Sequence, residues 1–214
     1  MTSAVIACAV LLQFAVAAYF YPVMPEVVAS HWGFSGGPDG YAPKLLALFA
    51  LPVMTAAIVA LLVAVPRIDP LGANVRKFRK QYDTFVAMIA LLMLAMQAYV
   101  VLWNSGVQVS MNLLMPAVLS AMYFYTGVML GHSRRNWFVG IRTPWTMSSD
   151  AVWQSTHRRA AKLFKAAAVV TLAGVALPAY AIWFVLVPVL FAAAYSVIYS
   201  YFEYSKTRPR SGHG

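Results

Sequence analysis

The stretch that decides the fold is Ala166–Phe202, AAAVVTLAGVALPAYAIWFVLVPVLFAAAYSVIYSYF, which carries no charged residue. A membrane-spanning helix needs about 20 largely apolar residues, so this run is too long for one crossing. Leu177-Pro178-Ala179-Tyr180 lies near its middle, where a proline ends or kinks a helix and a tyrosine suits the membrane interface. We therefore predict two spans joined by a tight turn, over 162–178 and 181–203.

Four more uncharged runs of similar length occur earlier in the chain. They predict helices over about 4–23, 45–66, 84–103 and 111–131, which gives six transmembrane helices. The composition agrees, because 62% of the 214 residues are hydrophobic, only 10% are charged and the mean hydropathy is +0.70. In soluble domains about a quarter of the residues are charged. The chain is therefore predicted to be an all-α polytopic integral membrane protein, with a single membrane domain over 1–214.

The basic residues behind the net charge of +10 lie mainly in certain connections between the predicted spans. Lysine and arginine concentrate in the second and fourth connections and in the tail, at Lys206, Arg208 and Arg210, whereas the odd-numbered connections carry only Lys44. Because basic loops stay on the cytoplasmic side, both termini are predicted to be cytoplasmic. The basic residues are spread over three membrane-proximal segments, so we expect membrane lipids as partners and no nucleic acid.

The middle of each predicted span lacks a charged side chain. Such a charge costs at least about 2.5–3.5 kcal/mol and is kept chiefly for ion pathways, proton relays or catalysis. Uncharged polar residues such as Gln13, Thr55 and Gln97 more often make hydrogen bonds between helices. The chain also lacks HExxH and Walker motifs. We therefore expect no catalytic residues, no metal site and no cofactor, and a protein that is not an enzyme.

The predicted outer loop, 24–44, is too long for a plain hairpin. Gly36-Gly37-Pro38-Asp39-Gly40 favours a tight turn, because each of these residue types suits a corner of the backbone. Trp32, Phe34 and Tyr41 flank this turn and are placed to bury against the outer ends of the helices. Two interpretations stay open: an interfacial cap that seals the bundle, or a surface that contacts a ligand, since long ordered loops are often functional.

The predicted inner motif loop, 132–161, is dense in conformationally restrictive residues. Gly140 permits close backbone approach, Pro144 forces the preceding residue toward an extended conformation, and the planar Arg142 fork suits bidentate recognition. An interfacial segment, with tryptophans at the headgroups and arginines on phosphates, is the alternative. Because interfacial anchoring needs no such fixed order, the pattern favours a specific folded motif.

A helix is predicted within the second half of this loop. Ser148 or Ser149 can cap it, with Asp150 favourably placed in its first turn. On that helix Trp153 and His157 are four residues apart and share a face.

Two segments of the chain carry a family resemblance. The inner segment Asn136-x3-Gly140-Ile141-Arg142-Thr143-Pro144-Trp145-Thr146-x-Ser148-x4-Trp153-x3-His157-Arg158 resembles the hallmark motif of the SdpI family of bacterial membrane proteins. The outer segment Tyr21-Pro22-x2-Pro25-x5-His31-Trp32-x3-Gly36-x-Pro38-Asp39-Gly40 is similar to a domain of unknown function often found at the start of these proteins. It departs from that domain where a second proline often precedes the histidine, since residues 27–30 contain none.

The resemblance implies an immunity protein of the bacterial cytoplasmic (inner) membrane. Such a protein gives resistance to a secreted antimicrobial peptide toxin and acts as a receptor that signals to a cytoplasmic repressor protein. By this analogy the toxin meets the outer loop, at Pro25, His31, Trp32, Gly36, Pro38 and Asp39. The inner partner meets the inner motif loop, at Asn136, Gly140, Arg142, Thr143, Pro144, Trp145, Trp153, His157 and Arg158.

Two other functions remain open at this point. A small membrane transporter or lipid-handling protein is suggested by the basic inner motif loop and by the polar residues of the third and fourth helices. An active site on a lipid headgroup, with His157 as general base, is the other. That chemistry needs a carboxylate or a metal ion beside the imidazole.

Overall fold

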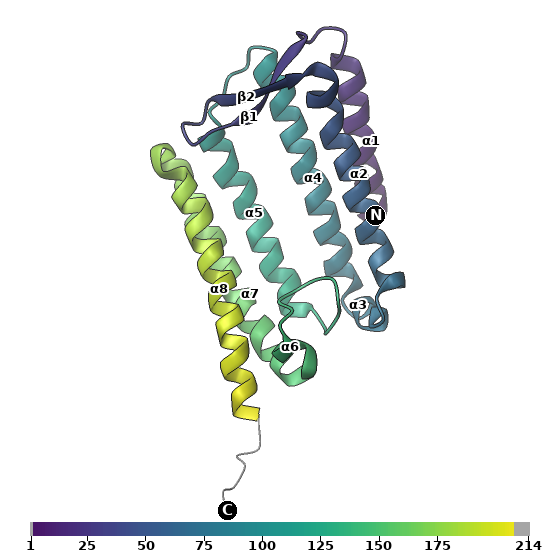
Figure 1. Cartoon of the computed structure of the whole chain (residues 1–214), viewed down its shortest axis with the longest axis vertical. Coiled ribbons are helices and arrows are strands. Elements are labelled where there is room, and N and C mark those ends of the chain that lie inside the picture. The colour runs from purple at the N-terminus through teal and green to yellow at the C-terminus, as the bar shows by residue number, and fades with distance from the viewer. Residues whose placement is uncertain (1, 208–214) are drawn as a thin grey trace, which may run out of the picture.

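The computed structural model describes residues 2–207, and helices make up most of it (Figure 1). The long helices are α1 (Thr2–Phe20), α2 (Lys44–Ile68), α4 (Arg79–Asn104), α5 (Met111–His132), α7 (Asp150–Ala173) and α8 (Ala181–Thr207). Short helices are α3 (Gly72–Arg76) and α6 (Pro144–Ser148), and two 3-10 turns, Gly174–Ala176 and Pro178–Tyr180, join α7 to α8. Two strands, β1 (Val27–Trp32) and β2 (Pro38–Pro43), form a hairpin. Arg208 and Arg210 of the predicted basic tail lie outside the described residues.

Five of these helices are long and apolar enough to cross a membrane: α1, α2, α4, α5 and α8, the last counted from Pro178. The prediction of a polytopic, all-α membrane protein is thereby confirmed, with the small hairpin as its one addition among the described residues. Several helix ends differ from those predicted. The first helix ends at Phe20 instead of 23, and α4 begins at Arg79 instead of 84.

Helix α7 differs from the other long helices because its middle is basic, with Arg158, Arg159, Lys162 and Lys165. It is one continuous helix from Asp150, whereas the sequence suggested a span that begins only at 162. Its 24 residues extend about 36 Å. Directly after it, Gly174 packs against Pro116 near the start of α5, so α7 runs antiparallel to α5 along most of its length. A sixth membrane crossing, made by α7, stays a prediction, and the course of α7 along α5 supports it.

Helices α5 and α7 approach each other closely at a glycine. A Cβ added to Gly127 would lie 2.8 Å from the Ala161 carbonyl oxygen and 2.8 Å from Cγ of Lys165. Gly131 follows one turn later on the same face, with a built Cβ 3.4 Å from that of Ala161. Small residues at this spacing let helix backbones pack tightly in a membrane. The contact fixes the inner end of α5 against the helix that carries Trp153 and His157.

Buried polar side chains join the first three long helices. The Thr55 hydroxyl donates to Oε1 of Gln13 (2.9 Å), and Nε2 of Gln97 donates to the Leu48 carbonyl (3.1 Å). All three side chains have no exposed surface. For these residues the predicted interhelical hydrogen bonds are confirmed.

The hairpin lies across one end of the bundle, which we call the outer end (Figure 1). Its turn is closed by the Gly33 N–H, which donates to the Gly37 carbonyl (3.0 Å), and Gly36 has a φ of +81°. The sequence placed the turn at Gly36–Gly40, which is wrong, because residues 38–40 already belong to β2. Pro38 suits the start of an edge strand, where its missing N–H breaks no ladder.

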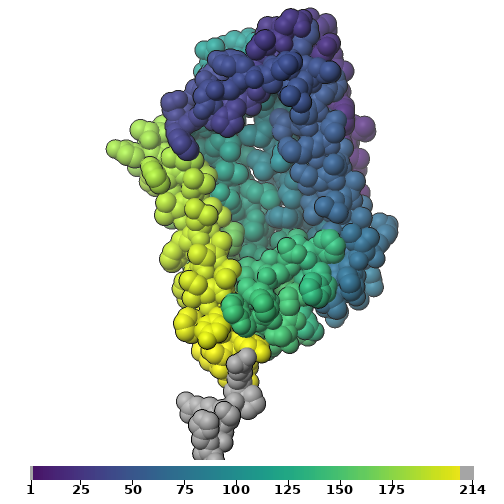
Figure 2. Space-filling view, in the orientation of Figure 1, coloured from purple at the N-terminus to yellow at the C-terminus, as the bar shows by residue number. Residues whose placement is uncertain are grey.

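The two ends of the bundle are closed by different parts of the chain. The hairpin covers the outer end, whereas the segment between α5 and α7 covers the opposite, inner end beside α3 (Figure 1). Between them the surface is hollowed on the face that separates α8 from α2, with α4 and α5 behind (Figure 2). The two segments singled out by the sequence therefore lie at opposite ends of the bundle.

Candidate functional site

The inner motif loop is held together by Asn136, which is fully buried. Its Nδ2 donates to the carbonyls of Arg134 (2.8 Å) and Val139 (2.9 Å). Its Oδ1 accepts from the backbone N–H groups of Phe138 (3.0 Å) and Val139 (2.7 Å). One side-chain amide thus satisfies four backbone groups in a segment that has no regular structure. This residue shapes the loop and is not accessible to a partner.

Gly140, Trp153 and His157 form a compact cluster below this loop. The rings of Trp153 and His157 stack, with centroids 4.0 Å apart, and both side chains are about 1% exposed. The backbone at Gly140 has a φ of +116° and lies against them, so that an added Cβ would sit 2.5 Å from Nε2 of His157. The expected close backbone approach at Gly140 is confirmed, and the imidazole is what it approaches.

Both nitrogens of His157 bond to the backbone. Nε2 accepts from the Ile141 N–H (3.0 Å), which requires that Nδ1 carries the proton and donates to the Trp153 carbonyl (2.8 Å). Burial lowers the pKa of His157 from 6.5 to about 4, and the bond to the Trp153 carbonyl offsets part of this effect. The side chain is therefore neutral at pH 7. No acid is hydrogen-bonded to it among residues 2–207, which leaves the proposed general base without a mechanism.

Helix α6 fastens the same loop to α8. Thr143 caps it, its hydroxyl accepting from the Thr146 N–H (3.2 Å), and Pro144 takes the first helical position, which needs no N–H. The Thr143 hydroxyl also lies 3.0 Å from that of Ser200 on α8. Next to this bond, Trp145 packs edge to face on Tyr201 (5.1 Å). As the sequence allowed, Ser149 caps α7, accepting from the Val152 N–H (3.4 Å).

Other members of the motif are exposed. Arg142 and Arg158 are both exposed, and Arg142 donates to the Trp137 carbonyl. The side chain of Trp137 is 53% exposed, and Phe138 beside it is 36% exposed. The motif therefore divides into buried residues that hold its shape and an exposed cationic and aromatic surface at the inner end.

The outer hairpin is fastened to the ends of α4 and α5. Asn104, the last residue of α4, accepts from the Ala29 N–H (2.9 Å) and donates to the Ala29 carbonyl (3.0 Å). At the tip, Asn112 donates to the Phe34 carbonyl (3.0 Å). Trp32 packs on Tyr99, with ring centroids 4.8 Å apart. Of the aromatic residues expected to bury here, Trp32 is partly buried, whereas Phe34 is 78% exposed and Tyr41 is 63% exposed.

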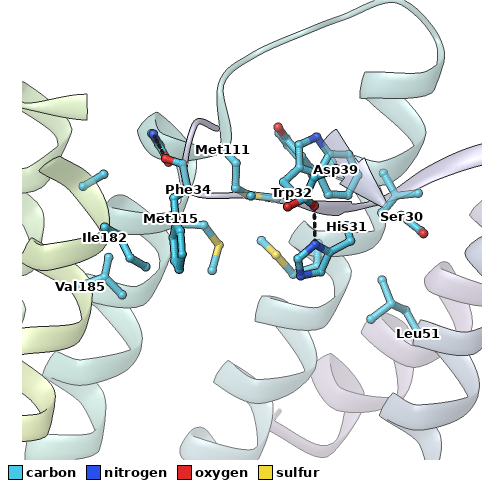
Figure 3. A pocket seen from close by; sticks show the side chains of 16 residues that line it. Ser30, His31, Trp32, Phe34, Asp39, Leu51, Met111, Met115, Ile182 and Val185 are labelled. Atoms are coloured by element: carbon cyan, nitrogen blue, oxygen red, sulfur yellow. Dashed lines mark hydrogen bonds and ion pairs between the residues drawn. The ribbon is translucent and has the colours of Figure 1, made fainter. Parts of the chain in front are cut away.

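A cavity of about 520 Å³ lies beneath the hairpin (Figure 3). Its wall is mainly apolar and comes from α2, α4, α5 and α8, with Met96, Met115, Ile182 and Val185 among the side chains. At its rim Nδ1 of His31 lies 2.5 Å from Oδ1 of Asp39. The hairpin thus roofs a space that opens between the helices.

The predicted outer residues fall into two groups. His31, Trp32 and Asp39 line the cavity. Gly36 forms the turn and contacts the start of α5, and Pro38 begins β2, so these two shape the hairpin. Pro25 precedes β1, is exposed and does not line the cavity. Within residues 2–207 no three His, Cys, Asp or Glu side chains gather as a metal site would need.

Comparison with known protein families matches residues 133–200 to the SdpI/YfhL protein family and residues 8–56 to a domain of unknown function, DUF1648. The resemblance of the inner motif loop to the SdpI family is thereby confirmed. The chain is 24% identical to the Immunity protein SdpI of Bacillus subtilis (strain 168) over 205 residues, which cover 95% of each chain. No solved structure matches it significantly. The SdpI region contains the inner motif loop with α7 and most of α8, and the DUF1648 region contains the hairpin.

Two residues missed by the sequence analysis lie between these family regions. Asp69 is 6% exposed, and its Oδ2 accepts from the Trp137 N–H (2.9 Å) while Oδ1 accepts from the Leu71 N–H (2.7 Å). Asn74 donates to the Arg135 carbonyl (2.9 Å). The turn around α3 therefore supports the SdpI motif from outside it. An acid in a loop otherwise rich in lysine and arginine was the only signal for Asp69.

Proposed function

We propose that this chain confers immunity to a secreted antimicrobial peptide toxin and, as a receptor, signals its presence to a cytoplasmic repressor. The observation that carries the proposal is the similarity to the Immunity protein SdpI along 95% of both chains. That similarity takes in both ends of the bundle, where an outer and an inner partner would bind. The bacterial cytoplasmic membrane is the corresponding location, with the basic inner end facing the cytoplasm.

The outer cavity is the place where we expect the toxin to be held. It is roofed by a fastened hairpin, and its apolar wall suits a bulky aliphatic or aromatic side chain of a peptide. Methionines in that wall can adapt to different shapes, because their side chains are unbranched and flexible. The exposed Phe34 and the carboxylate of Asp39 at the rim supply contacts for the remainder of the peptide.

The inner surface is where we expect the repressor to bind. Arg142, Arg158, Trp137 and Phe138 are exposed there, and aromatic residues with arginine are enriched where proteins bind one another. The buried residues Asn136 and His157 keep this surface in one shape. The role expected for the motif is therefore binding, without catalysis by its own residues.

A growth assay tests the proposal. The chain is expressed in a sensitive bacterial host, which is then exposed to secreted peptide toxins, beginning with the product of any toxin gene that neighbours this one. Ile182→Trp fills the cavity and is expected to abolish protection, whereas Leu190→Trp places the same ring on an exposed face of α8 and should preserve it. If neither the wild type nor Leu190→Trp protects the host at normal expression, the result counts against immunity.

The signalling part has its own test. Arg142→Ala, at unchanged expression, is expected to weaken toxin-dependent induction of a reporter gene, since it removes an exposed cation from the inner surface. Solute or lipid flux in liposomes reconstituted with the protein would instead favour a transporter or lipid-handling protein.

A further inference from the structure

A polar pocket of about 410 Å³ lies at the inner end, between the turn after α3 and the start of α7. It is the counterpart of the outer cavity in position but differs in chemistry, because its wall is mainly polar. Three segments that are distant in sequence supply the wall: Asn74 and Lys77 from one, Arg134 and Arg135 from the next, and Asp150 and Gln154 from the third. Toxin binding at the outer end does not account for this pocket.

The charges in the pocket are unbalanced. Lys77, Arg134 and Arg135 face a single carboxylate, that of Asp150, so the wall carries a net charge of +2. Nε of Arg135 lies 2.9 Å from Oδ1 of Asp150, which already pairs these two residues. Arg134 is exposed and has no ion-pair partner within residues 2–207. Two cations are thus left without an anion.

The walls of the pocket are held in place before any ligand binds. Asn74 bridges two of the segments, because its Nδ2 donates to the Arg135 carbonyl (2.9 Å) and its Oδ1 accepts from Nζ of Lys77 (3.1 Å). Nη1 of Arg135 also donates to the Met147 carbonyl (2.8 Å). Gln154 lines the same pocket, and its side-chain amide is a neutral donor. Preorganised donors of this kind lower the cost of binding an anion.

We propose that this pocket binds a phosphate group, supplied either by an anionic lipid headgroup or by free phosphate. Two cations without an anion are enough to neutralise a phosphate, whether it is a diester or the free ion, and the guanidinium fork of Arg134 can bind two of its oxygens. The pocket lies at the helix ends where lipid phosphates are found, and basic pockets between membrane helices bind anionic headgroups. Bound phosphate would join the α3 turn to the SdpI motif.

The experiment uses the full-length protein purified in detergent. Binding of phosphatidylglycerol and of phosphatidylcholine is measured by native mass spectrometry, and inorganic phosphate is titrated onto delipidated protein in a thermal-shift assay. The pocket variant is Lys77→Gln/Arg134→Gln. The matched control, Arg67→Gln/Lys80→Gln, removes the same charge from exposed positions at the inner end that do not line the pocket.

The wild type is expected to bind phosphatidylglycerol in preference to phosphatidylcholine, and the pocket variant to bind it about 30-fold more weakly, because it loses two cations near the phosphate. The control should keep the wild-type affinity. Binding of inorganic phosphate with no lipid preference, lost in the pocket variant alone, would identify free phosphate as the source. An equal loss of affinity in the pocket variant and the control, or binding of neither phosphatidylglycerol nor inorganic phosphate by the wild type, would overturn the proposal. Arg134→Lys keeps the charge and should therefore retain binding. Its comparison with the pocket variant shows whether the loss of binding comes from the lost charge.

Discussion

Adding one methyl group at Gly140 tests whether the backbone conformation and the contact with His157 together hold the inner motif loop. Gly140→Ala forces a side chain into a φ of +116°, which costs about 1–3 kcal/mol. The new Cβ would lie 2.5 Å from Nε2 of His157 and displace the bond from the Ile141 N–H. That loss adds about 1–2 kcal/mol. We therefore expect a total destabilisation of about 3 kcal/mol.

The chain offers a matched control for the backbone part of this cost. Gly106 also has a positive φ, of +96°, but a Cβ added there meets nothing within 4 Å. Gly106→Ala therefore carries the conformational strain without the clash. Thermal unfolding of both variants in detergent micelles measures the difference. With about 2–4 °C per kcal/mol for a chain of this size, Gly140→Ala should melt about 6–12 °C below the wild type.

The comparison can fail in a clear way. If Gly140→Ala melts no lower than Gly106→Ala, the approach to the imidazole contributes nothing and the described cluster does not stabilise the loop. A double variant with His157→Ala adds a second check. Because the methyl group then has no imidazole to meet, the two substitutions should destabilise by less than the sum of their separate effects.

Three further predictions concern the same end of the bundle. Because the pKa of His157 is lowered to about 4 in the fold, the unfolded state binds more protons between pH 6.5 and 4. The free energy of unfolding should therefore fall by roughly 3 kcal/mol on acidification through this range, with no contribution from His157 to its pH dependence above pH 6.5. Thermal melts of His157→Gln across the same range should lack this part of the pH dependence. Asp69→Ala should lower the free energy of unfolding by about 3 kcal/mol, because two backbone donors lose a charged acceptor. Asp83→Ala breaks an ion pair on the surface of a helix and should lower it by under about 1 kcal/mol in the same measurement; equal losses would contradict a special role for the buried acid. Gly127→Leu should lower the melting temperature more than Gly131→Ala, because only the former must move the α7 backbone, and a reversed order would refute the close approach.

The membrane fold was accessible from the sequence because it depends on long local patterns. Runs of uncharged apolar residues gave the candidate spans, and the expected cap at Ser148 or Ser149, with Asp150 in the first turn, located the start of α7 to within one residue. The outer hairpin was not predicted. Its strands are short and tied to Asn104 and Asn112, which lie far along the chain, so no local periodicity reports them.

The candidate site was accessible only in part. The order of residues around Gly140 showed that the segment is folded, yet it did not separate the buried His157 from the exposed Arg142, since exposure depends on the path of the whole loop. The support from Asp69 joins residues 68 positions apart. Such a contact leaves no pattern in a single sequence.

The amide of Asn104 takes the place of a neighbouring strand. By occupying both the N–H and the carbonyl of Ala29, it closes the free edge of β1 at its middle. An open edge is where an extended peptide can add itself to a sheet through main-chain hydrogen bonds. With that route closed along β1, the peptide toxin of the proposed function would be recognised there by its side chains, and the proposed resistance would discriminate among toxins by their sequence.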